Sequence, residues 1–280
     1  MASITIYTLN QQRLNSDNPD GTVVARILSA QIVERHSTSK AHLLRILTDV
    51  EEGDWCRRSV VLKPGSLTPA SVVFDDLPAY DREALSAFLN EIGATDTGAA
   101  VFIGDGKATA VLPPFPLKAD SLHEGVNTAE LRELLERQVV TGVVLLRMGR
   151  FAVAVLQGEF VSATKTDTRY VKNQHRAGGQ SQRRFMRSRD RLVRELFDKT
   201  CKIVRDVFEP FGNDIDYVLL GGERNVLQSF RERCRLMQDL GPKILIRTLR
   251  MNTPNQATLK NIAFEVWKSR VLTLELVDDR

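Results

Sequence analysis

The sequence is poor in the residues that build disulfide-rich, zinc-binding and membrane-spanning proteins. Its three cysteines, Cys56, Cys201 and Cys234, are far apart, odd in number and without C-x-x-C spacing, so they support neither a disulfide framework nor a zinc site. No run approaches the roughly 18 apolar residues that a membrane span needs, and the N-terminus lacks the basic region and apolar stretch of a signal peptide. Aromatic residues make up only 6% of the chain, which argues against a surface that stacks several bases. We therefore expect a cytoplasmic protein without a metal or another cofactor.

What the sequence does contain is ordinary globular material and one concentrated block of positive charge. Its 280 residues, 42% of them hydrophobic, suffice for two modest domains with a buried core. The net charge of +4 is mild, but residues 169–194 hold nine Lys or Arg residues and His175 against one acid, Asp190. This local excess is larger than that of the whole chain, so the remainder is slightly acidic. Such asymmetry predicts one surface that faces nucleic acid.

The first 120 residues predict a small α+β domain. The expected elements are a hairpin from 3–9 and 22–28, helices at 39–50 and 81–92, short strands at 59–62 and 71–74, and a second hairpin within 98–112. Gly93 should end the second helix, and Gly106 should supply the positive φ of the hairpin turn. Pro113-Pro114-Phe115-Pro116 then interrupts the pattern. We place the boundary just after it, which divides the chain into domains 1–120 and 121–280.

The second domain is predicted as an α/β unit. The expected elements are a helix at 128–140, a hairpin within 142–156 that turns at Gly149, a polar basic loop at 164–177, a helix of about eight turns that starts at Ser181 and ends at Pro210, a strand at 217–220, a helix at 225–238, a strand at 243–249, a helix at 258–271 and a last short strand at 272–277. This alternation is typical of helices packed on a sheet. The apolar positions of the long helix include Phe185, Leu192, Leu196, Val204 and Phe208.

The chemistry-bearing segment is Gly178-Gly179-Gln180, between the basic loop and the long helix. Two consecutive glycines let the backbone adopt conformations closed to other residues and approach another surface closely. The Gln180 amide cannot act as a general base, but it can orient a water molecule, and its main-chain N–H can stabilise an oxyanion. By itself the tripeptide is a weak signal and favours a flexible connecting loop. The arginines that follow it suit phosphate contacts beside the positive end of a helix.

The wider string resembles the class 1 peptide release factors of archaea and eukaryotes. In this chain, a basic loop precedes Gly178-Gly179-Gln180-Ser181, and the next helix carries Arg184-Phe185-x-Arg187-x-Arg189. The apolar strand that ends in Gly221-Gly222 and the hairpin before the loop also correspond, so the resemblance covers roughly residues 128–280. It implies an RNase H-like release-factor catalytic domain, a mixed sheet with packed helices, preceded by the smaller α+β domain.

The departures from that family are informative. Residues 1–117 do not resemble the codon-reading domain and contain no Asn-Ile-Lys-Ser sequence. The better match is to stand-alone ribosome-rescue peptidyl-tRNA hydrolases of the ankyrin-and-zinc-finger type, which free nascent chains from stalled large subunits. The resemblance thus implies a monomeric, ribosome-dependent hydrolase that enters the peptidyl transferase centre and cleaves peptidyl-tRNA without reading a stop codon.

The resemblance also assigns roles to residues. Gly178, Gly179 and Gln180 would form the catalytic tip, with Gln180 placing the water or its amide holding the oxyanion. The predicted RNA contacts are His175, Arg176, Arg183, Arg184, Arg187 and Arg189. Two alternatives stay open: a nuclease that cuts the tRNA acceptor end, and a non-catalytic module that binds the ribosome or RNA. A metal-dependent nuclease would need clustered carboxylates, and the sequence does not identify such a cluster.

Overall fold

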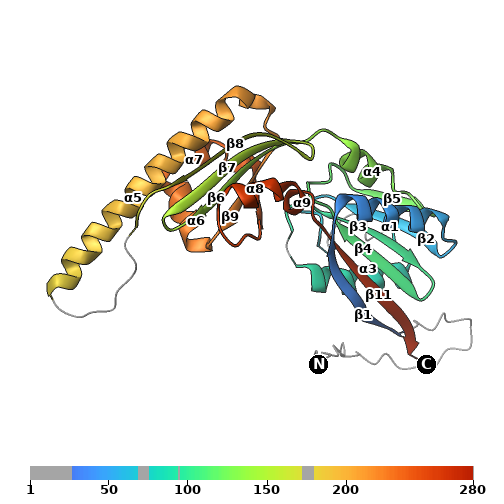
Figure 1. Ribbon diagram of the computed structural model, residues 1–280. Coiled ribbons are helices and arrows are strands. Elements are labelled where there is room, and N and C mark those ends of the chain that lie inside the picture. The colour runs from blue at the N-terminus through green and yellow to red at the C-terminus, as the bar shows by residue number, and fades with distance from the viewer. Residues whose placement is uncertain (1–26, 69–75, 94, 172–179, 280) are drawn as a thin grey trace, which may run out of the picture.

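The computed structural model describes residues 27–68, 76–93, 95–171 and 180–279, which form two lobes side by side (Figure 1). Each lobe is built on one sheet. The first sheet has the strand order β1-β11-β4-β3-β2-β5. Its strands are β1 (Ile27–Thr38), β2 (Cys56–Leu62), β3 (Ala99–Gly104), β4 (Lys107–Leu112), β5 (Ser121–Glu124) and β11 (Ser269–Asp279). All of its pairings are antiparallel.

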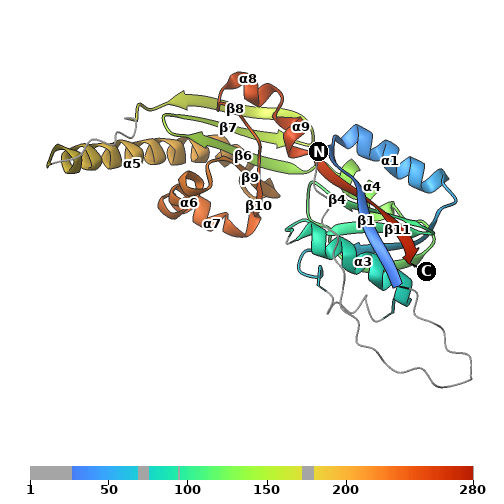
Figure 2. The same ribbon diagram turned by 90° about the horizontal axis from the view of Figure 1, so that it is seen from below.

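The two faces of the first sheet are covered by different helices. Successive side chains of a strand point to opposite faces, so alternate residues of each strand pack against different helices. Along β3, Ala100 and Phe102 pack on the side of α1 (Lys40–Glu52) and α4 (Ala129–Glu136). Val101 and Ile103 pack on the side of α3 (Ala79–Ile92). Figure 2 shows α1 and α3 on opposite sides of this sheet. Since both faces of β3 are buried, its sequence is a continuous apolar run without alternation.

The second sheet has the strand order β10-β9-β6-β7-β8. Its strands are β6 (Val140–Arg147), β7 (Arg150–Gln157), β8 (Phe160–Thr168), β9 (Tyr217–Gly222) and β10 (Ile244–Thr248). The first three form an antiparallel meander, and β9 and β10 run parallel to β6. A meander extended by parallel strands on the side of its first strand is the RNase H-like order, so the predicted fold class, a mixed α/β sheet with packed helices, is confirmed.

The helices of the second lobe also divide between the two faces of its sheet. One face packs against α5 (Gln180–Phe208), α6 (Arg224–Arg233) and α7 (Arg235–Asp239). The other face packs against α8 (Gln256–Lys260) and α9 (Ile262–Val266). Two 3-10 helices, η1 (Glu209–Asp214) and η2 (Gly241–Lys243), precede β9 and β10. Pro210 lies in η1, directly after α5, and begins the break in the helix that its sequence predicts.

The lobes share one hydrophobic core at their junction. Phe115 stacks on Tyr217 with ring centroids 5.3 Å apart and meets Trp267 edge-on at 5.0 Å. The Trp267 indole N–H donates to the Gly158 carbonyl at 2.8 Å, and the Lys40 ammonium lies 4.3 Å from the centroid of the Trp267 ring. Because these rings connect strands of both sheets within a single buried cluster, the junction is packed like the interior of a domain.

The strands β5 and β11 lie beyond residue 120, yet both belong to the first sheet. The C-terminal strand inserts between β1 and β4 and pairs with both. The predicted division into domains 1–120 and 121–280 therefore stays a prediction, and the first sheet takes strands from both sides of it.

Most predicted elements in the described residues are confirmed. They include the helices near 39–50 and 81–92, both hairpins, the helix of about eight turns and the strands near 217–220 and 243–249. Gly106 and Gly149 have the positive φ that the hairpin turns need, 71° and 90°. The N-terminal hairpin and the strand at 71–74 fall almost wholly outside the described residues.

Two predictions were wrong in the second lobe. Residues 164–168 belong to β8 and not to a loop, because an edge strand with a solvated face has a Thr- and Lys-rich sequence. The segment 258–271 is not one helix: α8 and α9 end by Val266, and β11 begins at Ser269. Two smaller differences concern helix ends: α4 ends at Glu136, and the helix predicted at 225–238 is broken at Cys234.

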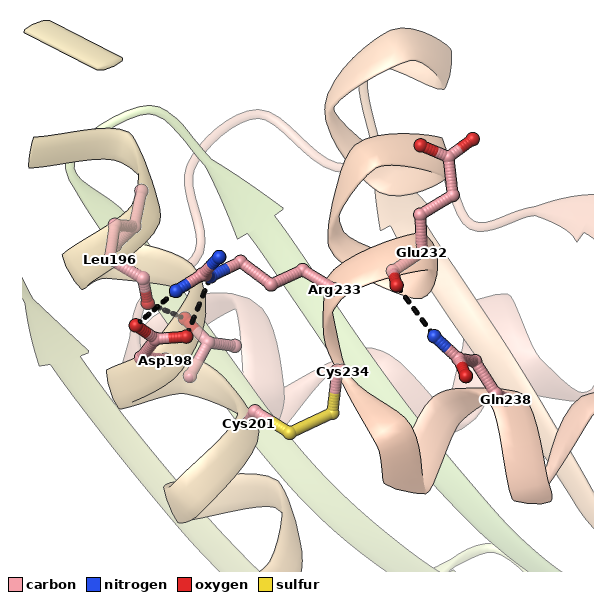
Figure 3. The surroundings of a disulfide bond; sticks show 8 residues. Leu196, Asp198, Cys201, Glu232, Arg233, Cys234 and Gln238 are labelled. Carbon is pink, nitrogen blue, oxygen red and sulfur yellow. Dashed lines mark hydrogen bonds and ion pairs between the residues drawn. A yellow bond between two sulfur atoms is a disulfide. The ribbon is translucent and has the colours of Figure 1, made fainter. Parts of the chain in front are cut away.

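The expectation that the cysteines form no disulfide was also wrong. Cys201 of α5 is bonded to Cys234, at the break between α6 and α7, with their Cα atoms 5.6 Å apart (Figure 3). Next to the bond, the Arg233 guanidinium donates two hydrogen bonds of 2.7 Å to the Asp198 carboxylate. The third cysteine, Cys56, is free and buried. A covalent bond and a bidentate ion pair thus fasten the middle of α5 to the adjoining helices.

We expect reduction of this disulfide to lower the free energy of unfolding by about 2–4 kcal/mol, because the bond closes a loop between residues 33 positions apart. The measurement is urea unfolding of the wild-type chain with and without a reductant. A Cys201→Ser/Cys234→Ser variant is the control and should be insensitive to reductant. Equal stability of the oxidised and reduced wild-type chains would contradict the prediction.

Candidate functional site

The long helix α5 is anchored in one half and projects from the sheet in the other. Leu196, Val204 and Phe208 are buried against the second sheet. No described side chain of α5 before Leu196 is buried. Figures 1 and 2 show this N-terminal half extending past the end of the sheet, away from the first lobe. The helix therefore carries its first residues well clear of the folded body.

The predicted catalytic tip lies at this projecting end. Gln180 is the first residue of α5, and Arg183 lies in the first turn. The residues Gly178, Gly179, His175 and Arg176 fall outside the described residues, so their assignments stay predictions.

The predicted RNA contacts on α5 are spread over more than one side of the helix. Arg184 and Arg187 are exposed, whereas Arg189 is half-buried. Phe185 is half-buried as well and has a contact partner. The sequence predicts that Phe185 turns toward the core while neighbouring arginines face outward, because successive residues of a helix are about 100° apart. Arg184 and Arg187 face outward, as that arrangement requires, and Phe185 is less exposed than either.

Ion pairs hold the next part of α5 on the edge strand β8. The Lys199 ammonium lies 2.7 Å from an Asp167 carboxylate oxygen and also donates to the Thr168 carbonyl at 3.1 Å. One turn nearer the tip, Arg169 forms an ion pair with Glu195. The hydrogen bond from Lys199 lowers the pKa of Asp167, and the hydrogen bond from Arg169 lowers the pKa of Glu195. These residues position the helix, and none of them is among the site residues that the sequence predicts.

Two acids of α5 are paired with arginines outside the helix. Glu195 and Asp198 both accept hydrogen bonds from arginines of neighbouring segments. Within the described part of the chain, no carboxylate pairs with Arg184, Arg187 or Arg194. The projecting half of α5 consequently presents positive charge that is available to a partner.

The end of the second sheet next to the projecting helix is also basic. An open hollow of about 620 Å³ lies at the carboxyl ends of β6, β9 and β10, a common position for ligands on α/β sheets. Arg147 and Arg250 line it, and Glu223 is its one acidic lining residue. No group of three or more His, Cys, Asp or Glu residues that could hold a metal ion occurs in the described ranges. This end has the charge of a phosphate-facing surface.

The chain is similar in part to curated release factors of archaea. Peptide chain release factor subunit 1 of Methanopyrus kandleri is 30% identical over 115 residues, which are 41% of this chain and 28% of that protein. The corresponding protein of Pyrobaculum aerophilum is 28% identical over 195 residues, or 64% of this chain and 50% of that protein. The chain thus spans less than a third of the length of the first of these relatives.

Solved structures of related description also align. The archaeal translation termination factor aRF1 aligns over 82% of this chain and 73% of its own, with 17% identity and a TM-score of 0.35. The Vms1 mitochondrial localization core aligns over 70% of this chain and 86% of its own, with 15% identity and a TM-score of 0.38.

A family model gives the more specific match. Residues 140–272 match the model of the Actinobacteria/chloroflexi VLRF1 release factor. The matched segment begins with β6 and ends within β11, so it comprises the second sheet and all the helices packed on it. The second lobe is a release-factor-like domain, and the resemblance stated from the sequence is confirmed.

We expect Asp167→Asn to reduce stability at neutral pH by up to about 1 kcal/mol, the usual scale for a partly exposed ion pair. Because the pKa of Asp167 is lowered in the folded chain, its contribution is present above the ordinary aspartate pKa and is lost as the pH falls through the folded value. Urea unfolding at pH 7 and near pH 3 should therefore show a difference between variant and wild type that shrinks in acid.

The control is Asp190→Asn, since Asp190 is exposed and makes no ion pair within the described residues. It should leave the pH profile unchanged. An Asp167→Asn profile that runs parallel to that of the wild type would show that this ion pair does not hold α5.

Proposed function

We propose that the protein hydrolyses peptidyl-tRNA on the ribosome and releases the nascent chain. The observation that carries the proposal is the position of Gln180 at the free end of a 29-residue helix whose other half is fixed in a release-factor-like domain. A helix anchored in this way can carry a small loop into a deep and narrow RNA cleft. We infer that the cleft is the peptidyl transferase centre of the large subunit.

The reaction would be attack of water on the ester that joins the peptide to the terminal tRNA ribose. The water oxygen bonds to the ester carbonyl carbon, the bond to the ribose oxygen breaks, and the tRNA leaves with a free hydroxyl. Gln180 has no proton-accepting base, so its contribution is to orient the water or to stabilise the oxyanion through its main-chain N–H. Gly178 and Gly179 would allow the close approach. We assign proton transfer to the surrounding RNA and the ribose.

The basic residues near the tip would position the domain. We propose that Arg176, Arg183, Arg184, Arg187 and Arg189 contact phosphates, and that His175 contacts RNA and does not act as a catalyst. Phosphate contacts fix register without reading sequence, which suits a factor that must work on any stalled chain. The exposure of Arg184 and Arg187 supports this role.

We further propose that the protein acts as a monomer in the cytoplasm and does not read stop codons. None of the helices among the residues that the structure describes is long and apolar enough to cross a membrane. A reducing cytoplasm would keep Cys201 and Cys234 as thiols, whereas an oxidising compartment would allow the bond between them. The state of this pair in cells is therefore a direct test of localisation.

Two other functions are separable by experiment. A nuclease acting on the tRNA acceptor end would leave a shortened tRNA and, if metal-dependent, would be inhibited by EDTA. A non-catalytic ribosome-binding module would tolerate replacement of Gln180. Intact tRNA after peptide release would identify hydrolysis.

We expect opposite behaviour from variants of the tip and of the helix. Arg184→Ala/Arg187→Ala should weaken ribosome binding and flatten its log–log salt dependence by about one unit per lost phosphate contact. Much of its release rate should return at saturating protein. Gln180→Ala should bind almost normally and release slowly even at saturation, because it acts on the transition state. Binding isotherms and single-turnover release rates across a salt series measure both.

The matched control is Arg45→Ala, which removes an exposed arginine from α1 in the first lobe and should change neither quantity. The division of roles is refuted if Gln180→Ala loses binding as severely as the arginine pair, or keeps its full release rate.

We also expect release from isolated large subunits that carry peptidyl-tRNA and no mRNA. The physical reason is that the first 117 residues lack a recognisable stop-codon reader. The measurement is peptide release with and without the small subunit programmed with a stop codon, followed by analysis of the tRNA end. A requirement for the stop codon would exclude the rescue function.

A further inference from the structure

A second concave site lies between α5 and α6 and shares no lining residue with the basic hollow described above. It has a volume of about 380 Å³ and is formed by the projecting part of α5, the N-terminal half of α6 and the β6–β7 turn. It contains none of the residues of the predicted catalytic tip. Its size is in the range of small-ligand sites in proteins.

The interior of this site is apolar. Phe197 and Val226 lie within its lining and are themselves 4% and 6% exposed. Met148 of the β6–β7 turn covers one side and is 38% exposed, although a large apolar side chain is normally more deeply buried. An aromatic ring and a flexible thioether together suit a flat, polarisable group.

The border of the site is polar and mainly cationic. Arg189 and Arg194 of α5 line it, together with Asn225 and Ser229 of α6. The Arg189 Nε is buried and has no hydrogen-bond partner. A buried donor without a partner costs free energy, so a ligand that supplies an acceptor here would be favoured. Asp190 is the single acidic lining residue.

Further arginines stand directly beside this border. Arg150 follows Met148 across the hairpin turn, and Arg224 directly precedes Asn225. Both are exposed, and neither pairs with a carboxylate of the described residues. Arg194 is likewise exposed and unpaired with any described acid. An apolar floor bordered mainly by arginines, with Asp190 as the single acidic lining residue, fits a ligand that is flat and apolar at its centre and anionic at its edge.

We propose that this site, the α5–α6 hollow, binds one unstacked base of single-stranded RNA. The base would enter against Phe197, Val226 and Met148, while Asn225 and Ser229 offer an amide and a hydroxyl to its edge. The flanking phosphates would lie on Arg189 and Arg194. Arg189 is nine positions along α5 from Gln180, which places the hollow about 14 Å from the start of the helix. This site would give the domain a nucleotide-binding contact separate from the predicted catalytic tip, and it deepens the proposed function, on which it rests.

The test measures RNA binding by the full chain and requires no peptide release, so it can fail separately from the proposed function. The probe is a short oligoadenylate, compared with an abasic oligomer that has the same number of phosphates. Ser229→Trp places a large side chain at the border of the hollow, and Gln228→Trp is the matched control on the adjacent exposed position of α6. Arg194→Gln tests the phosphate contact.

Ser229→Trp should weaken oligoadenylate binding about tenfold, the scale of one stacked base, and leave its salt dependence unchanged. Gln228→Trp should bind like the wild type. Arg194→Gln should weaken binding to both oligomers and lower the salt slope by about one unit. The proposal is overturned if Ser229→Trp and Gln228→Trp bind oligoadenylate equally well, or if the wild-type chain binds the abasic oligomer as tightly as oligoadenylate.

Discussion

One packing constraint governs the second lobe: the apolar stripe of α5 must be covered by the sheet, and only half of the helix has a sheet beneath it. Leu196 is the first buried residue of α5 among those described, and Val204 and Phe208 follow on the same face. A helix rises 1.5 Å per residue, so Gln180 stands about 24 Å beyond Leu196. The burial of one half of the helix therefore determines how far the other half extends beyond the sheet. The disulfide to Cys234 and the ion pairs to β8 and Arg169 restrict rotation of α5 relative to the sheet.

The distribution of charge follows the same division. In the anchored half, carboxylates of α5 face arginines of neighbouring segments, as Asp198 faces Arg233. In the projecting half, arginines predominate and the described ones before Arg191 have no carboxylate partner. Arginines of α5 without a described carboxylate partner are thus concentrated where the helix reaches outward. A field of this kind can orient the domain before contact, with the basic end leading toward an RNA surface.

The sequence was sufficient for features that local residues determine. Turn glycines, the amphipathic pattern of α5 and the break at Pro210 are local, and their elements appear near the predicted positions. Pairing between distant segments is not local. The edge strand β8 was mistaken for a loop because its solvated face makes it polar, and β11 was shortened because nothing near Ser269 indicates a partner as distant as Thr38. The bond between Cys201 and Cys234 likewise depends on how α5 meets α6. The sequence contains the motif that predicts the site. The residues that orient α5, such as Lys199 and Asp167, come together only in the folded chain.

The return of β11 to the first sheet has a mechanical consequence for the tip. The chain enters the second lobe after β5 and leaves it before β11, so the second lobe is attached to the first sheet at both of its ends. Two attachments restrict rotation far more than one linker would, and the stacked rings of Phe115, Tyr217 and Trp267 fill the junction between them. The lobes therefore behave as one packed body, because bending at the junction would open a continuous core. It follows that a contact made anywhere on the first lobe also constrains the direction in which α5 points. The orientation of Gln180 therefore depends on both sheets, although α5, which carries it, packs on only one of them.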